Sequence, residues 1–386
     1  MKVGVARETA PEERRVALVP ETIQKLRDAS MIVLVERGAG AAASFTDQSY
    51  VDAGARIVNT ATLYSTSDVI LRIHRPTPAE AKLCHEGQVV IGLLAPLLDP
   101  HAMAGLARHG VTAISLDAIP RTLSRSQGMD ALSSQSNVGG YKAVLIAANA
   151  FGRYFPLLTT PAGTAKPANV LVLGLGVAGL QAIATARRLG AMVKAYDVRR
   201  DTKEQAESLG AQFINLKSAI DATGQGGYAR ALTPQEQATQ QAELNGIIAT
   251  QDIVITTAQV PGRRPPILVT RAAVEGMKAG SVIVDMAATD LGGNCELSRP
   301  GKVVTSANGV EIQAPINLPS SMPTGASSFY SRNISNLLLN VVKDGNLSFD
   351  FADEVTAATV ITYGGKVVQP ATLKLLHPDP EGGAQA

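Results

Sequence analysis

The chain has 386 residues, of which 45% are hydrophobic and 18% are charged, a composition typical of globular proteins and not of disordered ones. Its 35 basic and 33 acidic side chains give a net charge of +2, which offers no sign of a nucleic-acid partner. Two cysteines are too few for a disulfide framework or a zinc cluster, so we predict no metal site. No apolar run approaches the roughly 18 residues of a membrane span, and the start lacks the apolar stretch of a signal peptide.

Short strand-like runs alternate with helix-like stretches through the first third of the chain. The runs lie at 2–8, 31–38, 55–59, 68–73, 88–94 and 111–117. This alternation predicts a parallel, doubly wound sheet. A long helix is expected at about 127–152, and a loop rich in Thr, Pro and Gly follows at 159–168.

The alternation then restarts with a strand, a glycine-rich turn and a helix. Further strands are expected at 211–215, 252–258, 281–287, 302–305 and 310–314, before a second long helix at 324–343. We therefore predict an α/β protein with two Rossmann-like, doubly wound parallel-sheet domains, the second inserted into the first. The outer domain would comprise 1–135 and 325–386, and the inner domain 136–324.

The inner domain opens with a turn that has the spacing of a dinucleotide-binding fingerprint. In VLVLGLGVAGL, Gly174, Gly176 and Gly179 follow an apolar strand and open a helix. Gly174 permits the tight turn, Gly176 lets the backbone approach a pyrophosphate, and Gly179 allows close packing of helix on strand. The amides near Val177 and Ala178 would face the phosphates. The plain alternative is a glycine-rich turn without a ligand.

Asp197 ends the next strand, 18 residues after Gly179, where a carboxylate accepts hydrogen bonds from the adenosine ribose hydroxyls. A 2′-phosphate would meet this carboxylate, so the sequence favours NAD(H) over NADP(H) in the inner domain. Arg199 and Arg200 follow closely and could neutralise a phosphate, which leaves the alternative open.

Several further strings are similar to one family. They include ERRVALVP near the N-terminus, PRTLSRSQGMDALSSQSNVGGYKA, TTAQVPGRRPP and SVIVDMAATDLGGNCELSRPGK. From Lys2 to about Val368 the chain resembles the NAD(H)-binding component, domain I, of proton-translocating nicotinamide nucleotide transhydrogenase. More distantly it resembles alanine dehydrogenase, which shares the R-V-A-x-x-P start and the fold.

In the transhydrogenase family an Arg, a Gln and an Asp form a loop over the nicotinamide ring. The resemblance assigns these roles to Arg121, Gln127 and Asp130, with Arg125 as the second arginine of the pattern. Ser133 matches a serine that contacts the nicotinamide end. Without the resemblance, these side chains could equally cap the following helix.

The resemblance assigns further residues to the nucleotide site. They are Asp197, Val198 and Arg199 at the ribose-binding strand end, Gly227 and Tyr228 in a mobile loop that closes over the nucleotide, and Gln259. Gln259 departs from the pattern, because an aliphatic residue is common there. AATDLGGN is another departure, one residue longer than usual.

The resemblance implies hydride transfer between NAD(H) on this chain and NADP(H) on a separate domain III, coupled to proton movement through membrane domain II. Such a transfer needs two aligned nicotinamides and no general acid or base. The family's domain I is a homodimer. Because no membrane segment is found before residue 386, the chain resembles the separate-subunit form. It would be cytoplasmic and held at the inner membrane by partner subunits.

The alternative is a stand-alone amino-acid dehydrogenase of the alanine type. Alanine dehydrogenases need a lysine in a K-E-P string and a histidine in a context like L-H-L-A. This chain has IHRP, with His74 in the lysine position, and GLLAP, with Leu94 in the histidine position. A base for amino-acid oxidation is therefore missing. His74 could be a replacement, but a half-exposed histidine at a strand end is the plainer interpretation.

Overall fold

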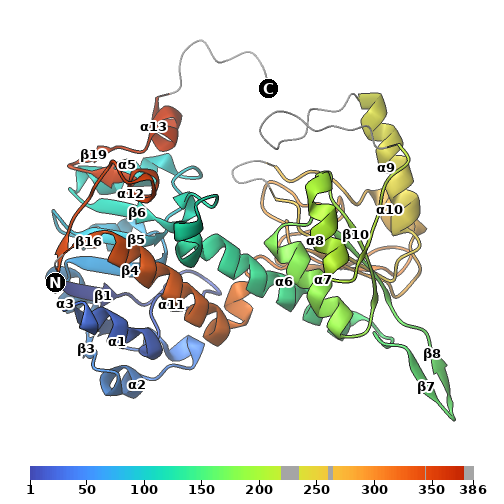
Figure 1. Cartoon of the computed structure of the whole chain (residues 1–386), viewed down its shortest axis with the longest axis horizontal. Coiled ribbons are helices and arrows are strands. Elements are labelled where there is room, and N and C mark those ends of the chain that lie inside the picture. Colours follow the sequence, from blue (N-terminus) through green and yellow to red (C-terminus); the bar gives the residue numbers. More distant parts are fainter. Residues whose placement is uncertain (219–233, 260–263, 344, 378–386) are drawn as a thin grey trace. The chain divides into compact units, whose positions relative to one another are not determined.

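The computed structural model describes residues 1–218, 234–259, 264–343 and 345–377 (Figure 1). The chain forms two compact units, one made of Met1–Gln135 and Pro319–Ala386 and the other of Ser136–Leu318. It enters the second unit within helix α6 (Ala131–Ala150) and leaves it shortly before helix α11 (Pro323–Asn340). The predicted α/β fold with two mainly parallel sheets is confirmed.

The first sheet has six strands within the described residues, in the order β3-β2-β1-β4-β5-β6, and all its pairs are parallel. The strands are β1 (Lys2–Val5), β2 (Ile32–Glu36), β3 (Arg56–Val58), β4 (Val69–His74), β5 (Val89–Leu93) and β6 (Thr112–Ser115). Each matches one of the runs expected from the sequence, although β4 ends one residue later. The strand order reverses between β1 and β4, which is the switch point where doubly wound sheets bind ligands.

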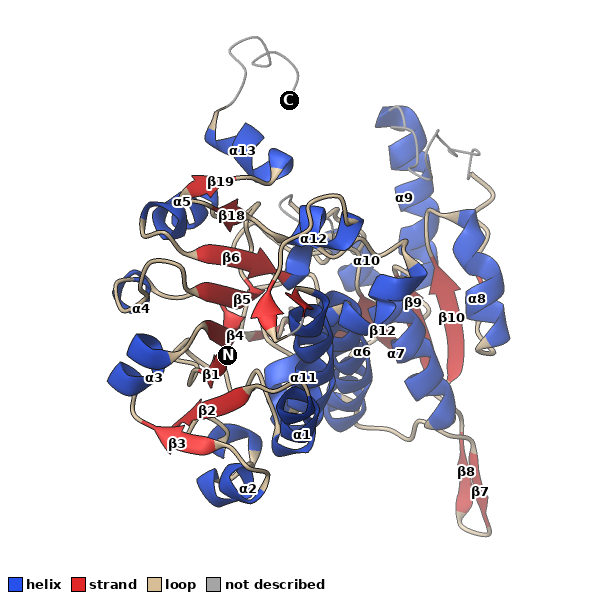
Figure 2. Ribbon diagram, turned by 60° about the vertical axis from the view of Figure 1, so that its left-hand side comes forward, coloured by secondary structure: helices blue, strands red, loops and turns tan. Residues whose placement is uncertain are grey.

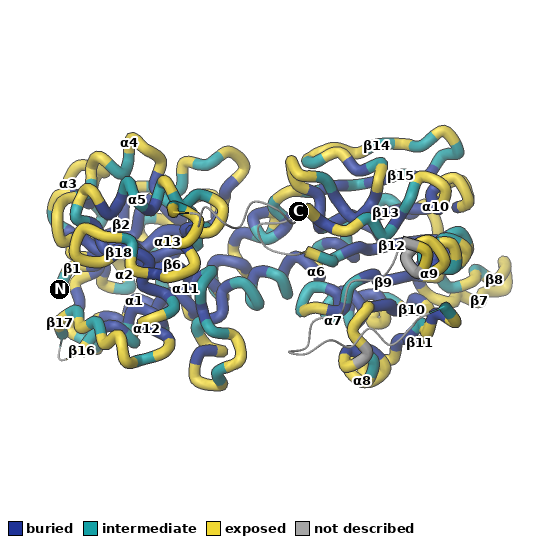
Figure 3. The backbone as a smooth tube through the Cα atoms, turned by 90° about the horizontal axis from the view of Figure 1, so that it is seen from above, coloured by how far each residue is buried: buried dark blue, intermediate teal, exposed yellow. Residues whose placement is uncertain are grey.

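Helices cover both faces of this sheet (Figure 2). They are α1 (Pro20–Asp28), α2 (Asp47–Asp52), α3 (Thr60–Thr66), α4 (Pro78–Ala81), α5 (Pro100–Arg108), α11, α12 (Glu354–Thr359) and α13 (Pro370–Leu376). Alternate strand residues enter different cores: Val69 and Leu71 pack with α1 and α11, whereas Ile70 packs with α3 and α5. Figure 3 shows the strands buried and the outer helix surfaces exposed.

Helix α11 holds the N-terminal segment through a series of side-chain hydroxyls. The amides of Val16 and Val19 donate to Ser327 Oγ and Ser331 Oγ, each at 3.0 Å. Tyr330 Oη donates to the carbonyl of Arg72 at 2.7 Å. The first unit is thus built from two ends of the chain that are far apart in sequence.

The second sheet has seven strands in the described part of the chain, in the order β11-β10-β9-β12-β13-β15-β14. They are β9 (Asn169–Leu173), β10 (Met192–Tyr196), β11 (Gln212–Phe213), β12 (Ile253–Thr256), β13 (Val282–Asp285), β14 (Val303–Thr305) and β15 (Glu311–Gln313). Edge strand β14 runs antiparallel to β15 because the connection 306–310 is too short for a crossover. The helices are α6, α7 (Val177–Arg188), α8 (Lys203–Ser208), α9 (Pro234–Ile248) and α10 (Arg271–Gly276).

Short hairpins and 3₁₀ turns lie between these elements. The segment expected to be a loop at 159–168 contains an exposed antiparallel hairpin of β7 (Leu158–Thr160) and β8 (Gly163–Ala165), visible in Figure 1. In the first unit, β16 (Val342–Lys343) pairs with β17 (Asn346–Leu347), and β18 (Thr362–Tyr363) with β19 (Lys366–Val367). The 3₁₀ turns η2 (Leu116–Ala118) and η3 (Ser124–Met129) precede α6.

Candidate functional site

The glycine-rich turn of the second unit has no room for side chains at two positions. Gly174 has φ +93°, and a Cβ there would lie 3.0 Å from the amide nitrogen of Ala258. A Cβ on Gly179 would lie 1.9 Å from the carbonyl oxygen of Gly174. These positions therefore require glycine, for backbone conformation at Gly174 and for close approach of α7 to the turn at Gly179.

Gly176 differs, because a Cβ there would meet nothing within 4 Å. It is the N-cap of α7, and no side chain caps the helix. The first amides of the helix, including those of Val177 and Ala178, lack intrahelical partners and carry the positive end of the helix dipole. The open space at Gly176 and these amide donors fit a phosphate group.

Asp197 follows β10 and is nearly buried, with 9% exposure. Its Oδ2 accepts hydrogen bonds from the Leu175 amide at 2.7 Å and from Arg199 Nη2 at 3.0 Å. Its Oδ1 accepts from the Arg199 amide at 2.8 Å and from Arg199 Nε at 3.1 Å. The carboxylate is therefore fixed beside the glycine-rich turn, as the fingerprint requires. Val198, between the two, is 59% exposed.

Two supports of the glycine-rich turn are absent from the sequence-based expectations. Thr257 Oγ1 donates to the carbonyl of Gly174 at 2.8 Å. In helix α6, a Cβ on Gly140 would lie 2.1 Å from the carbonyl oxygen of Ala178, so α6 contacts the first turn of α7. The signal was present in NVGGYKA, because glycine inside a helix is unfavourable and needs a packing reason.

Residues after β12 are also tied to the second sheet. Asn294 accepts from the Ala258 amide at 3.0 Å and donates to the carbonyls of Ala258 at 2.9 Å and Pro266 at 2.8 Å. Gln259 Nε2 donates to the carbonyl of Met286 at 2.9 Å. The unusual glutamine thus joins the segments that follow β12 and β13. Gly227 and Tyr228 lie outside the described residues.

In the first unit, Arg121, Asp130 and Ser133 form one hydrogen-bonded cluster. Arg121 donates from Nε to Asp130 Oδ2 at 3.0 Å and from Nη2 to Ser133 Oγ at 2.8 Å. Ser133 donates its amide to Asp130 Oδ1 at 2.8 Å and its hydroxyl to Oδ2 at 2.6 Å. Asp130 therefore both caps the start of α6 and orients Arg121, so the two interpretations of these residues are compatible.

Helix α11 anchors the loop that carries this cluster. The amide groups of Asn333 and Asn336 both donate to the carbonyl of Gly128, at 3.0 and 2.8 Å. Arg125 forms an ion pair with Asp353, and so it lies apart from the Arg121 cluster in its contacts. These anchors fix the backbone of η3.

Gln127 lies in η3, next to the anchored Gly128, and is exposed. Its side chain makes no hydrogen bond to any described residue, although its carbonyl accepts from the Asp130 amide at 3.2 Å. The structure thus presents a neutral donor and acceptor on a fixed backbone, free to contact another molecule.

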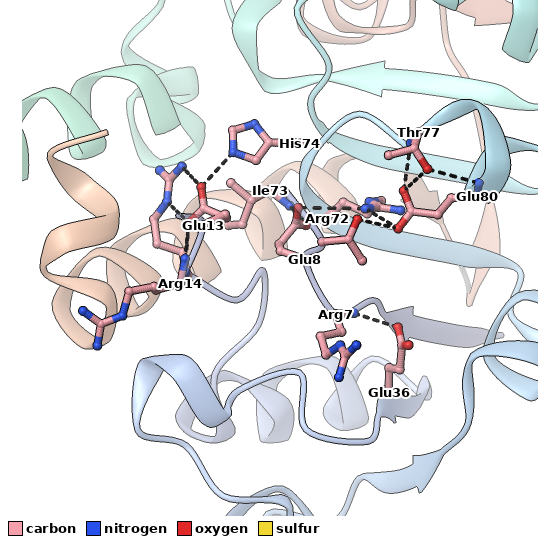
Figure 4. A network of polar contacts seen from close by, with 12 residues as sticks. Arg7, Glu8, Glu13, Arg14, Glu36, Arg72, Ile73, His74, Thr77 and Glu80 are labelled. Atoms are coloured by element: carbon pink, nitrogen blue, oxygen red, sulfur yellow. Dashed lines mark hydrogen bonds and ion pairs between the residues drawn. The ribbon is translucent and has the colours of Figure 1, made fainter. Parts of the chain in front are cut away.

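The residue in the alanine dehydrogenase lysine position is already engaged. His74 Nε2 lies 2.7 Å from Glu13 Oε2, and the two side chains point toward one another in Figure 4. Glu13 also accepts two hydrogen bonds from the Arg15 side chain, at 2.8 and 2.6 Å. Burial alone would raise the pKa of the Glu13 carboxyl, but Arg15 and His74 outweigh it and hold that pKa well below its usual value. Leu94 is fully buried.

Cys295 does not fit a nucleophile. Its side chain is 1% exposed, and burial raises the pKa of its thiol to about 11. Its amide donates at 2.9 Å to the buried carboxylate of Asp285, which also accepts from Ser298 Oγ at 2.7 Å. This region holds the end of β13 and leaves the thiol protonated at neutral pH.

Comparisons with known proteins agree with this arrangement. Residues 4–139 match the model of the alanine dehydrogenase/PNT N-terminal domain, and residues 143–370 match that of the C-terminal domain. The first portion of the NAD(P) transhydrogenase alpha subunit of Rhodospirillum rubrum is 44% identical over 382 residues, which covers 96% of this chain and 98% of the relative.

Two solved structures are also similar. A transhydrogenase from Sinorhizobium meliloti has a TM-score of 0.84 and 41% identity, covering 96% of this chain and 100% of the other. An L-alanine dehydrogenase has a TM-score of 0.79 and 28% identity, covering 97% of this chain and 99% of the other. The chain therefore belongs to the alanine dehydrogenase/PNT family, in its branch of NAD(P) transhydrogenase alpha subunits.

Proposed function

We propose that this chain binds NAD(H) and exchanges hydride with NADP(H) held on a partner component. The observation that carries the proposal is the fingerprint of the second unit: a turn that only glycine fits, uncapped helix amides, and Asp197 fixed beside them. Gly174, Gly176 and the amides of Val177 and Ala178 would hold the pyrophosphate, and Asp197 the adenosine ribose.

The Arg121 cluster and Gln127 are proposed to act at the nicotinamide end. A hydride leaves C4 of the reduced nicotinamide with its electron pair and bonds to C4 of the oxidised one, so no proton has to move. What the chain contributes is alignment of the two rings and exclusion of water. A carboxylate-held arginine and an unpaired amide on an anchored backbone are suited to that task.

Titration tests the cofactor assignment. We expect NADH to bind at least tenfold more tightly than NADPH, because a 2′-phosphate would approach the carboxylate of Asp197. Fluorescence of the reduced nicotinamide, followed during addition of the purified chain, measures both dissociation constants. Equal affinity for the two nucleotides would contradict the role of Asp197.

A second measurement separates this function from amino-acid oxidation. We expect no NADH production from alanine and NAD⁺, because Glu13 engages His74 and the fully buried Leu94 offers no base. The absorbance of NADH, recorded with an alanine dehydrogenase as the positive control, gives the answer. Alanine-dependent reduction above background would restore the dehydrogenase alternative.

The proposed partners are an NADP(H)-binding component, a proton-conducting membrane component and a second copy of this chain. The described helices include none that is long and apolar enough to span a bilayer. We propose that the partner components hold the chain at the inner membrane, on its cytoplasmic side.

A further inference from the structure

The carboxylate of Asp197 is saturated by its own chain. A carboxylate offers about four acceptor positions. Backbone amides of Leu175 and Arg199 fill two of them, and the Arg199 guanidinium fills the other two through Nε and Nη2. Ribose hydroxyls can therefore bind Asp197 only where the guanidinium gives up its bonds.

Arg199 is able to do so. Its side chain is 45% exposed, whereas that of Asp197 is 6% exposed, so the guanidinium lies on the solvent side of the pair. The hydrogen bond to Asp197 raises the pKa of Arg199 above its usual value, so the released guanidinium remains a cation at any physiological pH.

We propose that Arg199 is a specificity-determining residue, which competes with the adenosine ribose for Asp197 and weakens the rejection of a 2′-phosphate. The proposal rests on the proposed function, because it requires the adenosine ribose to bind at Asp197. It differs from the usual view of a lone carboxylate that excludes NADP(H).

The physical basis is the shared charge of the pair. Asp197 and Arg199 together are neutral, so an incoming phosphate meets a carboxylate whose field is largely cancelled. A guanidinium binds phosphate through two parallel hydrogen bonds, as it binds a carboxylate. Asp197 and a 2′-phosphate are therefore rivals for one cation. NADH is preferred as long as Asp197 keeps the guanidinium.

The first test removes the charge of Asp197 and keeps its shape. In Asp197→Asn an oxygen remains to accept from the Leu175 amide. We expect the Kd for NADPH to fall at least tenfold and the Kd for NADH to rise about tenfold, the scale of one charge-assisted hydrogen bond. Adding Arg199→Gln to this variant should abolish the gain for NADPH.

The second test keeps Asp197 and removes its competitor. Arg199→Gln alone changes an exposed side chain, and we expect the ratio of the NADPH Kd to the NADH Kd to rise several-fold. Arg188→Gln, which removes an exposed positive charge at the end of α7, is the matched control and should leave that ratio unchanged. Thermal unfolding of each variant confirms that it is folded.

The possible outcomes distinguish the cofactor assignment from the role of Arg199. A parent chain that binds no NADH contradicts the proposed function and this proposal together. A parent chain that binds NADH, with an Arg199→Gln variant whose Kd ratio equals that of the parent, overturns the specificity role alone. The same holds if the double variant keeps the NADPH affinity of Asp197→Asn.

Discussion

Replacing Gln127 with Asn is expected to slow hydride transfer about a hundredfold while NADH binding changes little. Asparagine keeps the amide and shortens the side chain by one methylene. The Gly128 carbonyl, held by Asn333 and Asn336, prevents the backbone from following the shorter side chain. A displacement of about 1 Å in a positioning group can cost roughly a hundredfold in rate. Stopped-flow transfer from NADH to an NADP⁺ analogue, with the purified NADP(H)-binding partner, measures it.

Asp130→Asn is the informative comparison. It removes the charge that holds Arg121 and accepts from Ser133, so both NADH affinity and transfer should fall. If Gln127→Asn transferred hydride at the parent rate, η3 would be only the turn that precedes α6, and its place in the active site would be withdrawn.

Gly140→Ala is expected to be the most destabilising single methyl that can be added to the second unit among the sites discussed. The new Cβ would lie 2.1 Å from the carbonyl oxygen of Ala178 and 2.8 Å from its carbon, and both are backbone atoms that cannot rotate away. Helix α7 would have to move, and with it the glycine-rich turn. We expect a loss of about 3 kcal/mol in the free energy of unfolding and weaker NADH binding.

Gly246→Ala is the matched control for this variant. Gly246 lies in α9 of the same unit, is exposed, and a Cβ there meets nothing within 4 Å. Alanine in an open helical position should stabilise the chain by up to about 1 kcal/mol. Urea unfolding of both variants, with NADH titration, separates crowding from helix propensity. Equal unfolding midpoints for Gly140→Ala and Gly246→Ala would show that α6 and α7 do not pack as described.

The parts of the fold that could be predicted from sequence are those with a local pattern. Apolar strand runs and the glycine spacing before α7 are readable because period and turn chemistry act over a few residues. The helix expected from residue 127 begins later, since Ser124–Met129 form a 3₁₀ turn and Asp130 caps the helix at Ser133. The β7–β8 hairpin is not predictable in this way, because strands of three residues leave no readable alternation.

The supports of the candidate site could not be predicted in the same way. Asn333 and Asn336 contact Gly128 across 205 and 208 residues of sequence, and no local pattern marks such a contact. The Asp197–Arg199 pair spans only two residues, yet its significance depends on the Leu175 amide that fills another acceptor position. Gln127, Arg121 and Ser133 were found through a family resemblance, and their roles stay predictions.

The serines of α11 have a consequence for synthesis on the ribosome. The amides of Val16 and Val19 pair with hydroxyls that lie 311 and 312 residues downstream. The second unit, in contrast, is the single continuous stretch Ser136–Leu318. As a chain emerges from its N-terminus, this later stretch can fold before the earlier one is complete. The first strands to be made thus wait longest for their cover, and a nascent chain of this protein exposes apolar surface at its oldest end until α11 arrives.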